Sequence, residues 1–357
     1  MSNSNRTRPG PATPARGVLV RLGTALCIAL AATAASADEW GAIELLGREI
    51  HAGTSQRFAA VPDRTFEASY LNMPVFVARG ATPGPALCIT AGVHGDELNG
   101  VEIARRAFSG IDAGSLRGTV IVLPAINAEG VRSGNRYLSD RRDLNRAFPG
   151  STGGSVARLI AHRVFTEVLV HCDALVDLHT ASNERTNLPQ VRADIADPDI
   201  EALAIHFGIG IVIAGKGPNG SLRREAAKAG IPAIIYEAGA PHRFEPDEIM
   251  HGVEGIGNLM AYLGMSDRPQ HEIPESRVYE RSRWIRAPRD NGGFFFPSSG
   301  LGEVVTKGQV LGEIVDPLTD AAYPVLANVS GEIIGMALSR PVLPGYALYH
   351  IAWHTSD

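Results

Sequence analysis

Residues 85–108, PALCITAGVHGDELNGVEIARRAF, join an apolar run to an amphipathic one across a short polar turn. Residues 85–91 have the length and composition of a buried strand, and apolar residues recur every three or four positions after Glu97, as in a helix packed on a core. The turn between the two carries His94, Asp96 and Glu97 among glycines. The stretch therefore predicts a strand and a helix that meet at a turn bearing reactive side chains.

Strand and helix patterns alternate in the same way through the middle of the chain. The apolar runs that predict strands are residues 73–78, 86–91, 119–126, 173–179, 210–214 and 232–239. Amphipathic stretches such as 155–170 and 246–264 lie between them, which predicts an α/β fold with a largely parallel or mixed sheet. Ligands bind beyond the carboxyl ends of strands in such sheets. We expect four side chains to share that edge: His94, Glu97, His179 and Glu237.

The chain changes character after about residue 270, where helical periodicity stops and short strand patterns broken by Gly and Pro begin. This predicts a small all-β, barrel-sandwich-like module. Its phrases VTKGQVLGEI (305–314) and VSGEIIG (329–335) resemble biotinyl and lipoyl carrier domains. A carrier function is rejected because the lysine to be modified should lie near residues 326–332, where there is none, and Lys307 is in another turn.

The first residues predict a cleaved export signal. Four arginines precede the apolar run 22–35, which ends in the small residues Ala35, Ser36 and Ala37. A membrane anchor, the alternative interpretation, needs about 20 apolar residues. We therefore expect residues 1–37 to be removed and the protein to be exported, with a periplasmic location and no stable membrane anchor afterwards.

Composition and charge narrow the function classes. The 357 residues are 45% hydrophobic with a formal net charge of -5. This composition is typical of a globular protein, and the charge lacks the excess of basic residues that nucleic-acid binding requires.

Cys88 and Cys172 lie in apolar runs of the mature chain. Although an oxidising compartment would allow them to pair, we expect two buried free thiols, because a domain of this size does not need a disulfide.

The turn residues suit a metal centre. A catalytic zinc ion takes three protein ligands, commonly two His and one carboxylate, and keeps a fourth position for water. The three-residue spacing of His94 and Glu97 allows both to reach one point, and His179 at another strand end supplies the third ligand. Asp177, on the same face of the strand, is either the second partner of the His179 ring or a buried acid satisfied elsewhere.

Several phrases together resemble the succinylglutamate desuccinylase/aspartoacylase family, relatives of the zinc carboxypeptidases. They are GVHGDELNG (92–100), NAEGVRSGNRYLSDRRDLNRAFPG (127–150), DLHTAS (177–182), RTNLPQVRAD (185–194) and IPAIIYEAG (231–239). The resemblance implies a zinc carboxypeptidase-like α/β/α sandwich with a mixed sheet over residues 38–270 and a β module over 271–357. It also implies one zinc ion per chain held by His94, Glu97 and His179.

The same resemblance implies roles for four further residues: Glu237 would be the general base, Arg136 would polarise the scissile carbonyl, and Asn145 with Arg146 would bind a substrate carboxylate. Residues whose part in the site stays open are Arg185, Arg192, Arg223, His242, Tyr323 and Tyr346.

These roles predict a zinc-dependent amidohydrolase of the deacylase type, in which a metal-activated water removes the acyl group from an N-acyl amino acid or related small amide. An exported carboxypeptidase-like metallopeptidase acting on short or cell-wall peptides is the alternative. A non-catalytic binding protein of the same fold is disfavoured because it would not need both a ligand triad and a base. The expected partner is a small molecule with a carboxylate, and the sequence leaves a homo-oligomer open.

Overall fold

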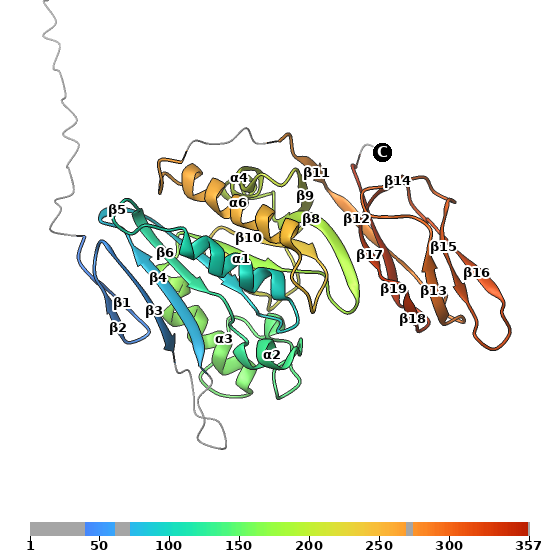
Figure 1. Ribbon diagram of the computed structural model, residues 1–357, viewed down its shortest axis with the longest axis horizontal. Coiled ribbons are helices and arrows are strands. Elements are labelled where there is room, and N and C mark those ends of the chain that lie inside the picture. Colours follow the sequence, from blue (N-terminus) through green and yellow to red (C-terminus); the bar gives the residue numbers. More distant parts are fainter. Residues whose placement is uncertain (1–39, 61–71, 269–273, 356–357) are drawn as a thin grey trace, which may run out of the picture. The chain divides into compact units, whose positions relative to one another are not determined.

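One large mixed sheet organises the computed structural model, which describes residues 40–60, 72–268 and 274–355 (Figure 1). In spatial order, the main path of the sheet is β12 (Arg281–Arg286), β19 (Ala347–Trp353), β17 (Gly331–Ala337), β8 (Arg185–Ala193), β10 (Ala233–Gly239), β7 (Ala174–His179), β5 (Thr82–Ala91), β6 (Arg117–Leu123), β4 (Met73–Arg79) and β3 (Thr54–Ala60). Off this path, β9 (Ile211–Ala214) pairs with β8 and β11 (Arg277–Tyr279), and β14 (Val304–Val305) pairs with β17. Strands β10, β7, β5 and β6 are parallel, whereas β8 and β4 flank them in the antiparallel sense.

Helices cover both faces of this sheet. One face carries α1 (Leu98–Ser109), α4 (Pro198–Phe207) and α6 (Pro246–Tyr262), which bury their apolar sides in one core cluster. The other face carries α3 (Val156–Glu167), α5 (Leu222–Lys228) and the hairpin of β1 (Ile43–Leu45) and β2 (Arg48–Ile50), which share a second cluster. The remaining helical segments are α2 (Ala128–Ser133), η2 (Leu144–Arg146) and η3 (Leu169–His171). The predicted α/β/α arrangement is therefore confirmed.

Side chains alternate between the two faces of the sheet along the central strands, and this alternation decides which of them reach the site. On β7, Val176 and Leu178 enter the core under α1 and α6, whereas Leu175 enters the core under α3 and α5. Because successive side chains point to opposite faces, Asp177 and His179 share the face of Leu175. On β10, Ile234 and Tyr236 likewise lie under α6, which leaves Glu237 on the face of His179.

The β-rich C-terminal segment contributes strands to two sheets. Its second sheet has the order β16 (Ala322–Leu326), β15 (Val310–Val315), β13 (Gly293–Pro297) and β18 (Arg340–Val342). This sheet and the β12–β19–β17 end of the large sheet enclose a separate core around Phe295, Leu311 and Tyr349. Strand β17 pairs with β8, so the large sheet is continuous from the α/β part into the β-rich part. The predicted β-rich C-terminal region is confirmed.

The expected export signal, residues 1–37, lies outside the described residues. Among the residues that the structure does describe, none of the helices combines the length and the apolar character needed to cross a bilayer.

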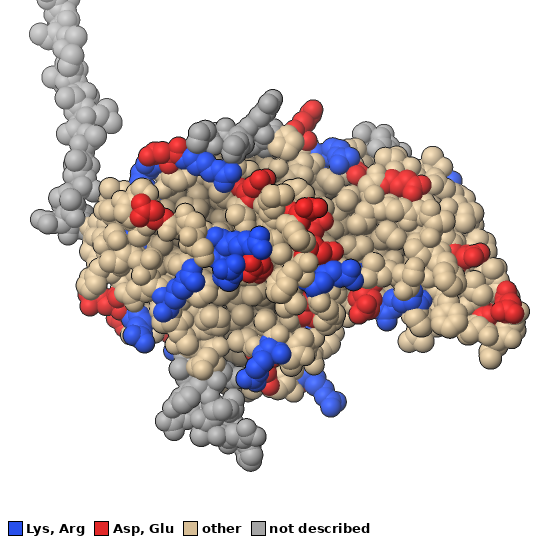
Figure 2. Space-filling model, viewed as in Figure 1, with Lys and Arg blue, Asp and Glu red and all other residues tan. Residues whose placement is uncertain are grey.

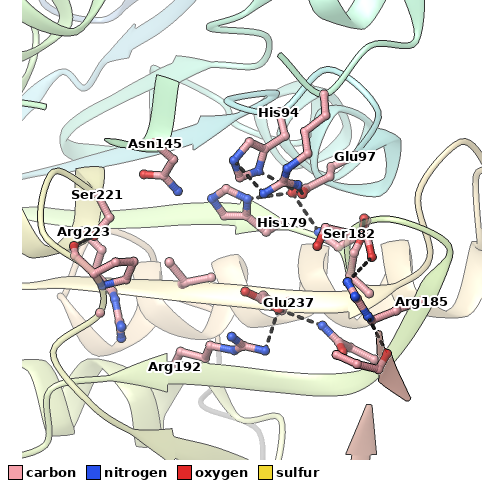
Figure 3. Close-up of a pocket in the computed structure, with 18 of the residues that line it drawn as sticks. His94, Glu97, Asn145, His179, Ser182, Arg185, Arg192, Ser221, Arg223 and Glu237 are labelled. Carbon is pink, nitrogen blue, oxygen red and sulfur yellow. Dashed lines mark hydrogen bonds and ion pairs between the residues drawn. The ribbon is translucent and has the colours of Figure 1, made fainter. Parts of the chain in front are cut away.

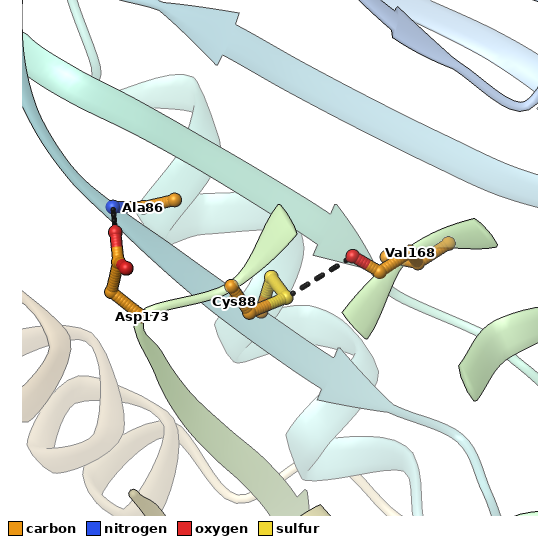
Figure 4. Close-up of a disulfide and its surroundings, with 5 residues drawn as sticks. Ala86, Cys88, Val168 and Asp173 are labelled. Carbon is orange, nitrogen blue, oxygen red and sulfur yellow. Dashed lines mark hydrogen bonds between the residues drawn. A yellow bond between two sulfur atoms is a disulfide. The ribbon is translucent and has the colours of Figure 1, made fainter. Parts of the chain in front are cut away.

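The prediction of two free thiols is wrong. Cys88, on β5, and Cys172, just before β7, form a disulfide with a Cα–Cα separation of 5.7 Å (Figure 4). Both cysteines are buried, at 1% and 8% exposure, and Cys172 leads into β7, the strand that pairs with β5. Apolar strand patterns fit buried thiols and buried disulfides equally, so the sequence could not separate the two. Such bonds are typical of proteins that fold in an oxidising compartment.

We expect the disulfide to contribute to global stability, because it closes a long loop between residues 84 positions apart. Replacing both cysteines (Cys88→Ala with Cys172→Ala) should lower the free energy of unfolding by about 2–5 kcal/mol. Urea denaturation of the variant and of the oxidised wild type measures this. A reductant should destabilise only the wild type, and equal stability of both proteins would contradict a stabilising role.

Candidate functional site

The turn after β5 brings His94 and Glu97 to the carboxyl edge of the sheet. Glu97 is the residue that precedes α1, and its backbone N–H donates to the His94 carbonyl. Gly95 lies against the backbone of α2, because a Cβ there would be 2.0 Å from the Gly130 carbonyl carbon. The turn therefore has room for glycine alone at this position, and its tightness holds the two side chains together.

Glu97 connects the two histidines. Its Oε1 lies 2.9 Å from His94 Nδ1, and its Oε2 lies 2.6 Å from His179 Nδ1. The three side chains are almost wholly buried, and one ligand atom from each lies within 4.8 Å of the others. The structure thus brings the three predicted ligands into one group that could hold a metal ion.

Both histidine rings have a carboxylate on their far side. Asp177 Oδ2 lies 2.8 Å from His179 Nε2, and its Oδ1 accepts a hydrogen bond from Thr90. Asp143 Oδ1 lies 3.1 Å from His94 Nε2. Carboxylates in this position fix the ring orientation and make the other ring nitrogen a better metal ligand. Asp177 therefore fills the partner role that the sequence left open, while Asp143, in the same phrase as Asn145, was missed.

The electrostatics of the group favour an ionised carboxylate. Burial alone would raise the pKa of Glu97, but the His94 and His179 imidazoles outweigh it and hold that pKa well below its ordinary value. Burial would lower the pKa of His179, but Asp177 and Glu97 raise it well above the ordinary value. His94 Nδ1 is buried and has no hydrogen-bond partner of acceptable geometry within the described chain. An orphaned nitrogen beside a carboxylate suits a metal ligand, and metal binding would displace the proton of the pair.

Arg136 lies directly against this group. Its Nη1 donates to Glu97 Oε1 at 2.6 Å, and its Nη2 is 3.0 Å from His94 Nε2. The backbone of the same segment is anchored to the turn, because the Gly95 N–H donates to the Arg136 carbonyl. Of the arginines in this part of the sequence, Arg136 is thus the one that reaches the ligand group.

Glu237 occupies the strand next to His179. The two residues are paired in the register of β10 and β7, and the Glu237 side chain is 15% exposed. Its Oε2 accepts a hydrogen bond from Asn187 and lies 2.9 Å from Arg192 Nη2, both on β8 (Figure 3). The structure therefore places the predicted base beside the ligand group, with two partners that the sequence did not assign to it.

Asn145 and Arg146 lie on the 3-10 segment η2, at the side of the pocket. Asn145 is buried, and its Oδ1 accepts a hydrogen bond from the Leu222 N–H at the start of α5. Arg146 donates to the Asn145 carbonyl at 2.6 Å. Figure 3 shows Asn145, Ser221 and Arg223 on one side of His179, with Arg185 on the other.

All seven predicted site residues line one pocket of about 370 Å³. Six arginines line it with only two glutamates: Arg136, Arg146, Arg185, Arg192, Arg223 and Arg286. On the face drawn in Figure 2, acidic and basic groups are interspersed, whereas arginines outnumber acidic residues in the pocket lining. A site so rich in guanidinium groups suits an anionic ligand.

Arg223 is the most deeply buried of these arginines, at 5% exposure. Its Nε and Nη1 have no hydrogen-bond partner among the described residues. Burial, with the positive charge of Arg192, lowers its pKa to about 10, so the guanidinium stays charged at neutral pH. Arg223 therefore brings a buried positive charge to this side of the pocket, and two of its nitrogens lack a protein partner within the described chain.

The β-rich segment also contributes to the pocket, through Trp284, Arg286 and Ala347. Of the tyrosines left open, Tyr346 lies near the pocket, because its ring is 4.5 Å from the Arg185 guanidinium carbon. Tyr323 lies on β16 of the second sheet. His242 is exposed and is not part of the pocket lining.

Fold and site together define an α/β protein with a metal-competent, arginine-lined pocket at the carboxyl ends of parallel strands. The succinylglutamate desuccinylase/aspartoacylase catalytic domain matches residues 83–263, and the chain belongs to that family.

Individual proteins are similar over most of the chain. The N-alpha-acetyl-L-2,4-diaminobutyric acid deacetylase of Halomonas elongata is 26% identical over 289 residues, which are 76% of this chain and 83% of that protein. The crystal structure of a succinylglutamate desuccinylase/aspartoacylase from Rhodobacter sphaeroides has a TM-score of 0.77 at 24% identity, covering 86% of this chain and 98% of the other. The product-bound ectoine utilization protein EutE (DoeB) of Ruegeria pomeroyi has a TM-score of 0.78 at 20% identity, covering 87% and 98%.

The ligand geometry predicts how metal content responds to substitution. We expect about one zinc ion per purified chain, because two imidazoles and a carboxylate with an open position suit that ion. His179→Ala should lose most of the zinc, and Asp177→Asn should weaken zinc affinity by about 10- to 100-fold. Elemental analysis and chelator competition measure both effects. His206→Ala, on α4, is the control, and full zinc in His179→Ala would remove His179 from the ligand set.

Proposed function

We propose that this chain is a zinc-dependent deacylase that hydrolyses the amide bond of an N-acyl amino acid or a related small amide. One observation carries the proposal: Glu237 stands beside the His94–Glu97–His179 group at the carboxyl edge of the sheet. The relative from Halomonas elongata is a deacetylase of an acetylated diamino acid, which supports the same reaction class.

The donor set fits the proposed metal. Zinc prefers nitrogen and carboxylate oxygen ligands, and the buried His94 Nδ1 without a hydrogen-bond partner is the kind of atom that a metal ion satisfies. When bound, zinc would polarise the scissile carbonyl and lower the pKa of a water molecule. His94, Glu97 and His179 would hold it, with Asp143 and Asp177 fixing the two rings.

Glu237 and Arg136 have complementary parts in the proposed reaction. Glu237 takes a proton from the attacking water and returns it to the amine as the carbon–nitrogen bond breaks, leaving a carboxylic acid and an amine. Negative charge develops on the carbonyl oxygen during the attack. Arg136, held against the ligand group by Glu97, stabilises that charge through its guanidinium.

The substrate carboxylate is assigned to the side of the pocket formed by Asn145, Arg146 and Arg223. Arginine binds a carboxylate through two parallel hydrogen bonds, and both Arg146 and the buried Arg223 line this side of the pocket. A volume of about 370 Å³ fits a small molecule. These features favour an acylated amino acid over a long peptide.

The proposal is tested by assaying the zinc-loaded protein against a panel of N-acyl amino acids and a panel of short peptides and muropeptides. Hydrolysis of the acyl amino acids is expected. Activity on the peptides alone would favour the carboxypeptidase-like metallopeptidase, and binding without hydrolysis of either panel would favour a non-catalytic protein.

Glu237→Gln removes the base while keeping the size of the side chain. We expect zinc content and fold to be unchanged and kcat to fall by about 10²-fold or more, since general base catalysis contributes about 10²–10⁴-fold. Turnover on the best substrate of the panel, with zinc analysis of the same sample, measures this. Loss of zinc would make Glu237 a ligand, and near-normal turnover would point to another base.

Arg146→Lys keeps the positive charge but loses the planar pair of donors. We expect kcat/KM for free-acid substrates to fall by about 10- to 100-fold, as hydrogen bonds to charged groups are worth about 1.5–3 kcal/mol. Substrates with an amidated carboxylate should be affected little. Arg142→Lys, in the same segment but outside the pocket, is the control. Equal wild-type efficiency on blocked and free substrates would contradict a carboxylate clamp.

A further inference from the structure

One oxygen of Glu237 receives two donors from the same neighbouring strand. Asn187 Nδ2 donates to Oε2 at 2.7 Å, and Arg192 Nη2 lies 2.9 Å from it (Figure 3). Within the described chain, Oε1 has no hydrogen-bond partner. The carboxylate is therefore held at one oxygen while the other is left to face the pocket.

The pairing of β8 with β10 explains this arrangement. Arg192 lies opposite Ile235 and Asn187 lies opposite Gly239, so the two donors approach Glu237 from both directions along the strand. The register is irregular between Glu237 and Gly239. In antiparallel pairs, diagonal neighbours on one face are within reach of long side chains. Both contacts are thus built into the sheet rather than carried by a loop.

Asn187 in turn is confined by the β-rich segment. Its neighbour on the other side is Gly335 of β17, directly opposite in the register. A Cβ at Gly335 would lie 2.5 Å from Asn187 Oδ1, whereas the next atom, His350 Cβ, would be 3.4 Å away. The backbone φ of Gly335 lies outside the left-handed region, so the constraint is one of space. Asn187 Oδ1 fills that space and has no hydrogen-bond partner in the described part of the chain.

We propose that Asn187 and Arg192 are positioning residues for Glu237, and that Gly335 preserves the amide orientation of Asn187. The inference rests on the proposed role of Glu237 as the base. When donors fix Oε2, the Glu237 carboxylate keeps Oε1 in a constant direction. The side chain then need not be ordered during the reaction. Through the contact at Gly335, the β-rich segment also acts on the base indirectly, in addition to lining the pocket.

Gly335→Ala is the most selective test of the contact. The one atom within 3.0 Å of the added methyl group is Asn187 Oδ1, at the end of a side chain, so we expect normal folding and zinc content but an Asn187 amide turned away from Glu237. With one of two donors lost, kcat should fall about tenfold while KM stays within about twofold. Gly300→Ala is the matched control, because no atom lies within 4 Å of the added Cβ and the φ there is ordinary. A crystal structure of Gly335→Ala with the amide unmoved would overturn the contact.

A double-mutant cycle distinguishes an effect of Gly335 that acts through Asn187 from a general effect on structure. Asn187→Ala should lower kcat at least as far as Gly335→Ala, and the double variant should be no worse than Asn187→Ala, because Gly335 acts only through Asn187. Additive losses would overturn that link. Arg192→Gln should also lower kcat, with partial recovery in Arg192→Lys, which keeps a charged donor.

The same series distinguishes failure of this inference from failure of the proposed function. Unchanged kcat in Asn187→Ala and Arg192→Gln, with a large loss in Glu237→Gln, would remove the positioning roles and leave the base in place. Unchanged kcat in Glu237→Gln would reject the base itself and the positioning inference with it.

Discussion

The buried carboxylate of Glu97 is the interaction on which the site depends. Removing a charge from water costs several kcal/mol unless partners replace the lost solvation, and Glu97 has them in His94, His179 and Arg136. Those partners come from three separate parts of the sequence, so the carboxylate is satisfied only when the turn after β5, the end of β7 and the segment after α2 are all in place. The burial of Glu97 therefore couples the metal-competent geometry to the fold itself.

The order of strands in the sheet brings the other pocket residues to this ligand group. Parallel strands β5, β7 and β10 end at one edge, which places the ligand group and Glu237 side by side. The antiparallel strand β8 then supplies Asn187 and Arg192, and its other edge pairs with β17. Because hydrogen bonding continues across β8, the β-rich segment is fixed relative to the pocket and can contribute Trp284 and Arg286 to its wall.

The sequence was sufficient to predict the strands and ligands for which hydrophobic periodicity and side-chain chemistry indicate the same structure. Apolar runs that end in polar residues predicted the strands carrying His179 and Glu237, and ligand chemistry with family resemblance predicted the group at one edge. Strand β8 was missed because RTNLPQVRA mixes a proline and charged residues into a weak alternation. The contact of Asn187 with Glu237 joins residues 50 positions apart. It follows from register, which no local pattern encodes. The Cys88–Cys172 pairing escaped prediction because an apolar strand pattern fits a buried thiol and a buried disulfide equally.

The positive charge of the pocket indicates that the site is most stable with an anion bound. A buried guanidinium with open donors, such as Arg223, is less stable than one paired with an anion, because burial removes solvation that the protein does not replace. Arg192 adds positive charge nearby, and the carboxylates of Glu237, Asp177 and Asp194 offset the burial of Arg223 only in part. An anionic ligand would supply the missing partner. On the proposed function, the substrate carboxylate does so, and its binding energy is then available to place the amide bond between Glu237 and the ligand group.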